Sequence, residues 1–222
     1  MKILVCTFYD DAIAEYGNLT SKINEKYCAK HQLDYVVSHT PTYKNRHPAW
    51  ENLPLIIKYI EKYDYIVWID ADAFFYIDSP HIEDIIRLHS STDFIFSRDL
   101  PNKEPPLGEI NTGIFIVKNT DYSKEFLKTW AYDENLFQQC KMKYRWDQGV
   151  LNDMIRGNIL NIREHMIVCE YTVLQHFFRE ELDNITHIPY IYHMAGRRAC
   201  NKEYERIEHS QEYYAKISTN NK

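Results

Sequence analysis

An uninterrupted apolar run at residues 65–69, which ends directly at Asp70-Ala71-Asp72, constrains the fold more than any other feature of the sequence. Apolar residues at every position are expected of a central parallel strand that helices cover on both faces. Other short apolar runs alternate with helical patterns along the chain. The predicted strands are residues 3–8, 35–38, 94–97, 113–117 and 188–193, and the predicted helices are residues 19–30, 53–63, 82–88, about 120–130, 150–155 and 202–217. This alternation predicts an α/β fold with a doubly wound, mostly parallel central sheet flanked by helices.

The length of 222 residues suits one domain with its own core. No internal repeat, low-complexity tract or interdomain linker interrupts the chain, so we expect a single domain over residues 1–222. The N-terminus holds only about five to seven apolar side chains before Asp10 and Asp11, too few for a membrane span or a signal-peptide core. We therefore expect no membrane span and a cytoplasmic location.

The formal net charge of -6 restricts the partners of the chain. Nucleic-acid binding takes most of its affinity from phosphates that Lys and Arg neutralise, so we expect no nucleic-acid partner. A single diphosphate remains compatible with this charge if a metal ion supplies the positive charge.

Asp70 and Asp72 follow the most apolar strand, where the two-residue period of a strand would point both carboxylates to the same side. Ligands of open α/β sheets bind outside the C-terminal ends of the strands. Two hard carboxylate oxygens there suit Mg²⁺ or Mn²⁺ with positions left for phosphates. For an isolated Asp-x-Asp, a helix cap or two solvated acids would be the favoured explanation, and only the context provided by other residues reverses this.

A second polar group follows the late apolar run at residues 188–192. His193 ends this run and is followed by Gly196, Arg197 and Arg198. The imidazole can complete a metal site with the two aspartates, and the arginines can clamp a pyrophosphate. Because a nitrogen ligand suits the harder Mg²⁺ ion less well, this set of ligands suits Mn²⁺ at least as well as Mg²⁺.

Two further motifs each have two interpretations. Asp147 is either the N-cap of the following helix or a carboxylate that faces a developing cationic sugar, and capping leaves Gln148 without a role. Asn111-Thr112-Gly113 either forms a floor for sugar hydroxyls or is a turn that enters a strand.

Five blocks, taken in chain order, resemble glycosyltransferase family thirty-four, which holds fungal α-galactosyltransferases, α-mannosyltransferase subunits and plant xyloglucan xylosyltransferases. The blocks are residues 47–56, 68–73, 111–119, 147–148 and 193–196, and the likeness covers about residues 1–200. Five blocks in order are far more specific than any one of them. The resemblance implies the A-type glycosyltransferase fold, a nucleotide-sugar donor, Mn²⁺, and retention of the anomeric configuration.

The resemblance also implies the roles of individual residues. It places the metal on Asp70, Asp72 and His193, the donor against Asp70 and Ala71, and its diphosphate near Gly196 and Arg198. It places the sugar near Asn111 and the catalytic pair Asp147 and Gln148, and the nucleoside near Thr7, Phe8 and Tyr9. The nucleotide-binding half would span about residues 1–100, the acceptor- and sugar-binding half about 101–200, and a C-terminal helix about 202–217.

Two features depart from the family pattern. Asn52 stands where the family usually has Lys, and the usual N-terminal membrane anchor is missing. A bacterial or viral cytosolic enzyme, or a trimmed chain, would explain the second departure.

Two other functions are alternatives to a glycosyltransferase. A phosphohydrolase of the haloacid dehalogenase type also uses Asp-x-Asp but needs Thr or Val where Phe74 stands. A non-catalytic subunit that binds a nucleotide sugar would hardly differ in sequence from an active transferase, although the presence of all three candidate metal ligands favours activity. The donor is expected to be a UDP-sugar, with GDP-mannose as the alternative, and the acceptor a glycan or another hydroxyl compound. The sequence leaves a homodimer open.

Overall fold

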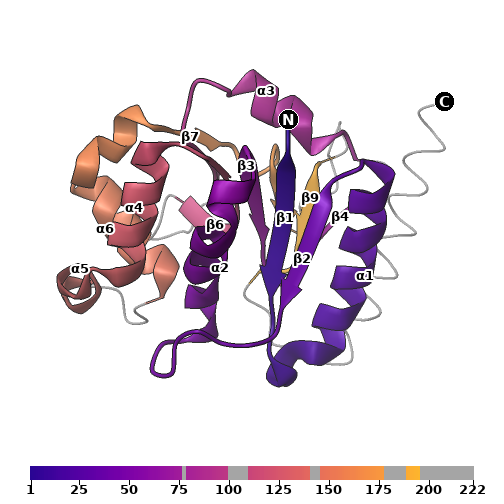
Figure 1. The fold of residues 1–222 in the computed structure, drawn as a ribbon, viewed down its shortest axis with the longest axis horizontal. Helices are drawn as coiled ribbons and strands as arrows, with labels where there is room; N and C mark the ends of the chain where they lie inside the picture. Colours follow the sequence, from indigo (N-terminus) through magenta and orange to yellow (C-terminus); the bar gives the residue numbers. More distant parts are fainter. Residues whose placement is uncertain (77–78, 100–109, 141–145, 178–188, 196–222) are drawn as a thin grey trace.

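The fold was analysed on a computed structural model, which describes residues 1–76, 79–99, 110–140, 146–177 and 189–195. Within these residues, six strands form the main sheet in the order β2-β1-β3-β6-β5-β7 (Figure 1). The strands are β1 (Ile3–Phe8), β2 (Asp34–Ser38), β3 (Tyr65–Ile69), β5 (Phe94–Arg98), β6 (Ile110–Lys118) and β7 (Met166–Cys169). β6 runs antiparallel to its neighbours β3 and β5, whereas the other neighbouring pairs are parallel. The predicted α/β fold with a mostly parallel sheet is therefore confirmed.

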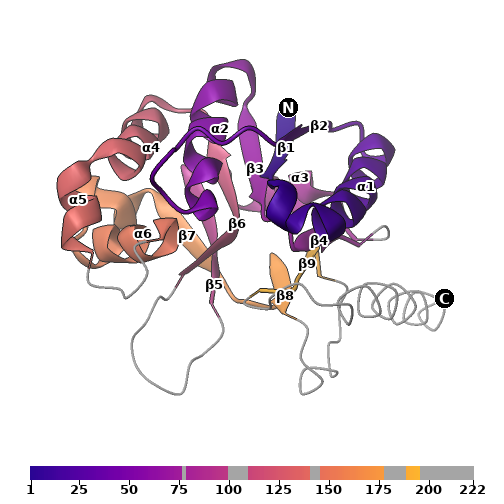
Figure 2. The ribbon, with the colours of Figure 1, turned by 90° about the horizontal axis from the view of Figure 1, so that it is seen from below.

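Helices cover both faces of this sheet, as Figures 1 and 2 show. The described α-helices are α1 (Ala14–Lys30), α2 (Asn52–Tyr59), α3 (Ile82–Leu88), α4 (Asp121–Tyr132), α5 (Glu134–Gln139) and α6 (Asp147–Arg156). Ile66 and Trp68 of β3 belong to one core cluster with side chains of α2, α4 and α6. Val67 and Ile69 belong to a second cluster with α1 and α3. The strand period thus feeds alternate residues into two cores, which explains why every position of β3 is apolar.

A small second sheet lies beside the main one and holds β4 (Ala73–Phe75), β9 (Ile191–His193) and β8 (Gln175–Phe177). β4 pairs antiparallel with β9, and Ala73 lies opposite His193. β8 pairs parallel with β9. This sheet brings the end of the described chain against the Asp-x-Asp segment.

The helix boundaries follow local capping. α1 begins at Ala14 rather than near residue 19, because the side chain of Asp10 accepts a hydrogen bond from the Ala12 N–H and starts a short 3₁₀ turn ahead of the helix. The side chain of Thr120 accepts a hydrogen bond from the Ser123 N–H at the start of α4. The predicted helix at 202–217 lies outside the described residues. No described helix reaches the length and apolarity that crossing a membrane requires.

The loop before α2 is fastened by two buried contacts. The carboxylate of Glu51 accepts hydrogen bonds from the backbone N–H groups of Thr42 (2.8 Å) and Tyr43 (2.9 Å). The guanidinium of Arg46 lies over the Trp50 ring at 4.6 Å and donates to the carbonyl oxygen of Ala131 at 2.8 Å. This segment, whose regular structure is the short 3₁₀ helix Pro48–Glu51, is therefore held in one place against α4.

Replacing Glu51 tests this anchor. We expect Glu51→Ala to lower the free energy of unfolding by about 1–3 kcal/mol, because two backbone N–H groups lose their acceptor. Urea denaturation at neutral pH measures the change. Glu61→Ala is the matched control, since Glu61 is exposed and pairs only with Lys124 at the surface. Equal stability losses in the two variants would contradict the anchoring role.

Candidate functional site

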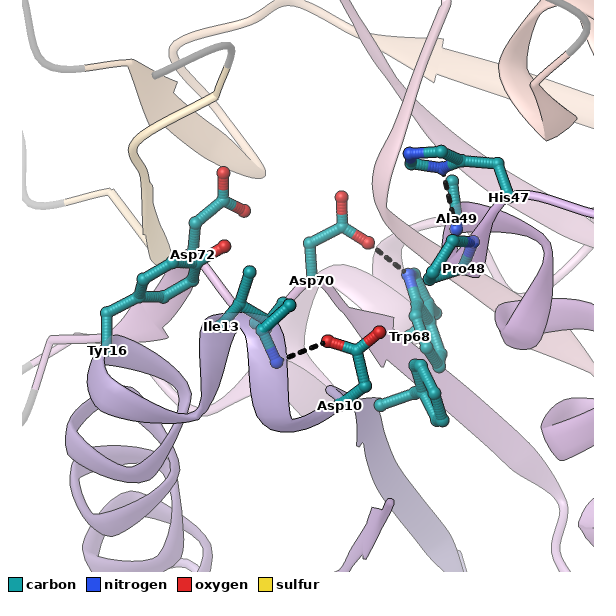
Figure 3. Close-up of a pocket in the computed structure, with 12 residues that line it drawn as sticks. Asp10, Ile13, Tyr16, His47, Pro48, Ala49, Trp68, Asp70 and Asp72 are labelled. Carbon is teal, nitrogen blue, oxygen red and sulfur yellow. Dashed lines mark hydrogen bonds between the residues drawn. The ribbon is translucent and has the colours of Figure 1, made fainter. Parts of the chain in front are cut away.

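Asp70 and Asp72 lie in a tight turn between β3 and β4. The Asp70 N–H donates to the Gly113 carbonyl oxygen at 2.7 Å, and the Ala73 N–H donates back to the Asp70 carbonyl oxygen at 3.0 Å. Both carboxylates point to the same side (Figure 3). The expected orientation is present, but its expected cause is wrong: β3 ends at Ile69, so a turn and not the strand period aligns the two side chains.

His193 joins this pair through the β4–β9 pairing. Its Nε2 lies 3.3 Å from Oδ1 of Asp72, and one ligand atom each from Asp70, Asp72 and His193 lie within 4.8 Å of one another. The Trp68 indole N–H donates to Oδ1 of Asp70 at 2.8 Å and holds that carboxylate in place. The three residues that the sequence nominated as metal ligands are thus close enough to share one ion.

Gln175 fixes which nitrogen of His193 faces the cluster. Its Oε1 accepts from Nδ1 of His193 at 2.8 Å, and its amide nitrogen donates to the Arg98 carbonyl oxygen at 3.3 Å. Since the amide oxygen can only accept, Nδ1 carries a proton, which leaves Nε2 as the nitrogen that can present a lone pair to a metal ion. A side chain in this role is typical of a metal site. The sequence carried no signal for Gln175.

Gly113 leaves the space that these side chains occupy. A Cβ atom at this position would lie 2.2 Å from Cε1 of His193 and 2.9 Å from Oδ2 of Asp70. No side chain fits there without moving the imidazole. The glycine of the predicted floor therefore makes room for the group of Asp70, Asp72 and His193.

The electrostatics of the cluster favour a bound cation. Burial and the neighbouring charge of Asp72 raise the pKa of Asp70 to about 7. Burial alone would lower the pKa of His193, but Asp72 and Asp70 raise it above its usual value. Two close carboxylates in a buried site repel each other, and a divalent ion relieves both the repulsion and the desolvation. The residues present therefore fit a divalent metal.

An open pocket of about 320 Å³ lies beside the cluster (Figure 3). Its lining residues are Phe8, Asp10, Ala12, Ile13, Tyr16, His47, Pro48, Ala49, Trp68, Asp70, Ala71 and Asp72. Among the predicted nucleoside contacts, Phe8 lines the pocket, whereas the buried side chains of Thr7 and Tyr9 do not. Tyr9 instead packs edge-on against His39 and donates to Asn18.

Asp147 is the first residue of α6 and is almost completely buried. The N-cap of α6 is Trp146, so the interpretation of Asp147 as the cap is wrong. Oδ2 of Asp147 instead accepts from the side-chain amide of Asn52 at 2.7 Å. Burial raises the pKa of Asp147 to about 6, although hydrogen bonds from Thr112 and Asn52 oppose this shift. The residue that replaces the usual Lys therefore contacts Asp147 directly and brings no charge.

Gln148 links α6 to the start of β6. Its Oε1 accepts from the Thr112 N–H at 3.3 Å and from the Asn111 side-chain amide at 3.5 Å. Its amide donates to Asp99 at 3.0 Å. The structure thus brings Asn111 and Gln148 together, while Gly196 and Arg198 lie outside the described residues.

Comparisons with known proteins agree on one family and one fold. The family described as nucleotide-diphospho-sugar transferase matches residues 22–204. Xyloglucan 6-xylosyltransferase 4 of Arabidopsis thaliana is 26% identical over 132 residues, which cover 55% of this chain and 25% of that protein. The chain therefore spans about a quarter of the length of this relative.

Two solved structures share the fold over nearly the whole chain. A glycosyltransferase involved in glycosylation of the major capsid of PBCV-1 has a TM-score of 0.71 and 18% identity, covering 94% of this chain and 98% of that chain. The galactosyltransferase LgtC, in complex with donor and acceptor sugar analogs, has a TM-score of 0.56 and 12% identity, covering 91% and 94%. These neighbours confirm the expected A-type glycosyltransferase fold.

The buried Asp147 predicts a pH-dependent stability difference. Since its folded-state pKa is raised from 3.8 to about 6, stability is lost as the pH rises through about 6 and the carboxylate ionises inside the fold. We expect Asp147→Asn to be more stable than the natural chain by about 1–3 kcal/mol at pH 8 and equally stable near pH 4. Denaturation in EDTA at both pH values measures this difference.

The partly exposed Asp153 on the same helix supplies the control. Asp153→Asn should show no such gain at pH 8. A pH-independent difference between Asp147→Asn and the natural chain would refute the burial of an ionisable carboxylate at this position.

Proposed function

The chain belongs to the nucleotide-diphospho-sugar transferase family, and we propose that it is a metal-dependent, retaining α-glycosyltransferase. It would transfer a hexose or pentose from a nucleoside-diphosphate sugar to a hydroxyl group of a glycan, free or on a protein. The observation that carries the proposal is the group of Asp70, Asp72 and His193 at the wall of an open pocket. Carboxylates alone would repel a diphosphate, whereas carboxylates that hold a divalent ion would attract it.

Asp70, Asp72 and Nε2 of His193 would hold this ion, with Mn²⁺ preferred over Mg²⁺ because one ligand is nitrogen. When bound, the ion acts as a Lewis acid that offsets negative charge on the leaving diphosphate. Gln175 holds the imidazole with Nε2 toward the cluster, and Trp68 holds the Asp70 carboxylate. These two contacts keep the ligands preorganised before the donor enters.

In the proposed reaction the acceptor hydroxyl attacks the anomeric carbon on the face that the diphosphate leaves. The bond between that carbon and the phosphate oxygen breaks, the new glycosidic bond forms, and the hydroxyl proton passes to the leaving phosphate oxygen. Asp147 and Gln148 would stabilise the positive charge on the sugar ring. Asp147 can do so only when ionised, that is, above about pH 6.

The donor is proposed to be a UDP-sugar, with GDP-mannose as the alternative. The Arabidopsis relative is named for xylosyl transfer, which makes a pentose donor as reasonable as a hexose. The nucleoside would lie near Phe8 at the end of β1, and Gly196 and Arg198 would contact the diphosphate. Membership of glycosyltransferase family thirty-four stays a prediction, as does the homodimer.

A thermal-shift panel tests the proposal. UDP, GDP, CDP and their sugar conjugates are each added with Mn²⁺ and with EDTA, because a ligand of the native state raises the melting temperature. Selective stabilisation by one nucleotide, only with metal, would support a metal-dependent transferase and name its base. No shift with any nucleotide would contradict it.

Asp72 is the residue whose charge the proposal needs most. We expect Asp72→Asn to reduce sugar transfer and donor hydrolysis at least about 100-fold while circular dichroism and melting temperature without metal stay unchanged. Asp10→Asn is the matched control, since Asp10 also lines the pocket but caps the first 3₁₀ turn, which Asn can do equally well. Full activity in Asp72→Asn would refute the assignment of the metal.

Gly113 provides a test that removes no ligand. We expect Gly113→Ala to weaken Mn²⁺ binding about tenfold or more, because the added methyl group must displace the His193 ring. Calorimetric titration of Mn²⁺ measures the affinity. At Gly157 an added Cβ meets its nearest atom at 3.4 Å, so Gly157→Ala should bind the ion normally. Unchanged binding in Gly113→Ala would place the ion elsewhere.

A further inference from the structure

A pair of stacked aromatic rings stands at the rim of the pocket. The rings of His47 and Trp146 lie with their centroids 4.9 Å apart and their planes inclined by 29°. His47 lines the pocket with Asp70 and Asp72, and Trp146 directly precedes Asp147 at the start of α6. Trp146 is 42% exposed, which is unusual for the largest apolar side chain and leaves ring surface accessible to a ligand.

The two rings are held rigidly although they come from distant parts of the sequence. His47 caps the short 3₁₀ helix Pro48–Glu51. The carbonyl oxygen of Trp146 accepts from the N–H groups of Gly149 and Val150 in the first turn of α6. Asn52 directly follows that 3₁₀ helix, and its hydrogen bond to Asp147 joins the segments that carry the two rings. A ligand that stacks here therefore meets a surface that is already formed.

The hydrogen bonding of His47 shows which polar group it offers. Nδ1 accepts from the Ala49 N–H at 3.2 Å, so the proton of the neutral imidazole is on Nε2. Figure 3 shows this second nitrogen on the side of the ring toward Asp70 and the pocket. Partial burial lowers the pKa of His47, so the ring is neutral at physiological pH. The pair offers a neutral aromatic surface with one hydrogen-bond donor.

We propose that the stacked rings of His47 and Trp146 form the platform on which one sugar ring of the acceptor lies. A pyranose has an apolar C–H face that stacks on indole and a rim of hydroxyls that needs donors such as Nε2–H. The two rings carry no positive charge of their own, so they would not select a phosphate. Trp146 also adjoins Asp147, where the proposed function places the transferred sugar, and the inference rests on that function.

Kinetics separate acceptor binding from donor chemistry. With methyl β-D-glucopyranoside, methyl β-D-galactopyranoside and methyl α-D-mannopyranoside as acceptors, we expect Trp146→Ala to raise the acceptor KM about tenfold. Donor affinity and hydrolysis of the nucleotide sugar by water should stay within about twofold. Trp146→Phe should restore most of the acceptor binding. Tyr132→Ala removes another exposed aromatic ring, at the end of α4 and not stacked on His47, and should change neither parameter.

Saturation-transfer NMR with the same three glycosides tests the contact without turnover. We expect saturation on the pyranose C–H protons with the natural chain and its loss with Trp146→Ala. No saturation with the natural chain, or equal saturation with both proteins, would overturn the platform. A loss of nucleotide affinity in Trp146→Ala would overturn it too, because the rings would then hold the base. Absence of donor binding and hydrolysis in the natural chain would instead refute the proposed function itself.

Discussion

The pairing of β4 with β9 is the contact on which the whole site depends. It sets Ala73 opposite His193 and so carries an imidazole from the late part of the chain to a turn that follows the central strand. The Met194 N–H donates to the Asp72 carbonyl oxygen at 3.0 Å and continues the pairing beyond the strand. Because both strands have only three residues, their association draws on the packing of Phe75 and Ile191 in the core that α1 and α3 also cover. The group of Asp70, Asp72 and His193 is thus a product of tertiary packing rather than of a local motif.

Local patterns were sufficient for much of the fold. β3 and α3 have the predicted boundaries because one is a fully apolar run and the other has helical apolar spacing. β4 and β8 were missed, since three residues are too few to show a period. The same limit explains why Gln175 was not found: its contact with His193 joins two strands of this small sheet. Asn52 was noticed only as a departure from a family pattern, and its bond to Asp147 required the fold.

The polar groups near the pocket lower the stability of the fold, but their hydrogen bonds hold the carboxylates in defined positions. Asp147 is buried and Asp70 is partly buried, and both carboxylates have raised pKa values. Hydrogen bonds from Trp68 and Asn52 hold them without supplying a full positive charge. Such groups destabilise a fold by themselves and are retained where their charge is used. The rest of the molecule offsets this with two large apolar clusters on opposite faces of the sheet.

Among the described strands of the main sheet, β6 alone runs antiparallel to its neighbours, and this determines which residues can meet at the edge where β3 ends. In a purely parallel sheet all strands end at the same edge, so only residues that follow strands meet there. β6 runs against β3, with Ile114 opposite Ile69, and therefore begins where β3 ends. Residues that enter one strand, Asn111 to Gly113, face residues that leave another, Asp70 to Asp72. Because of this reversal, residues that begin a strand and residues that follow a strand can both contribute side chains to the same edge of the sheet. These two sets of residues can vary independently of each other.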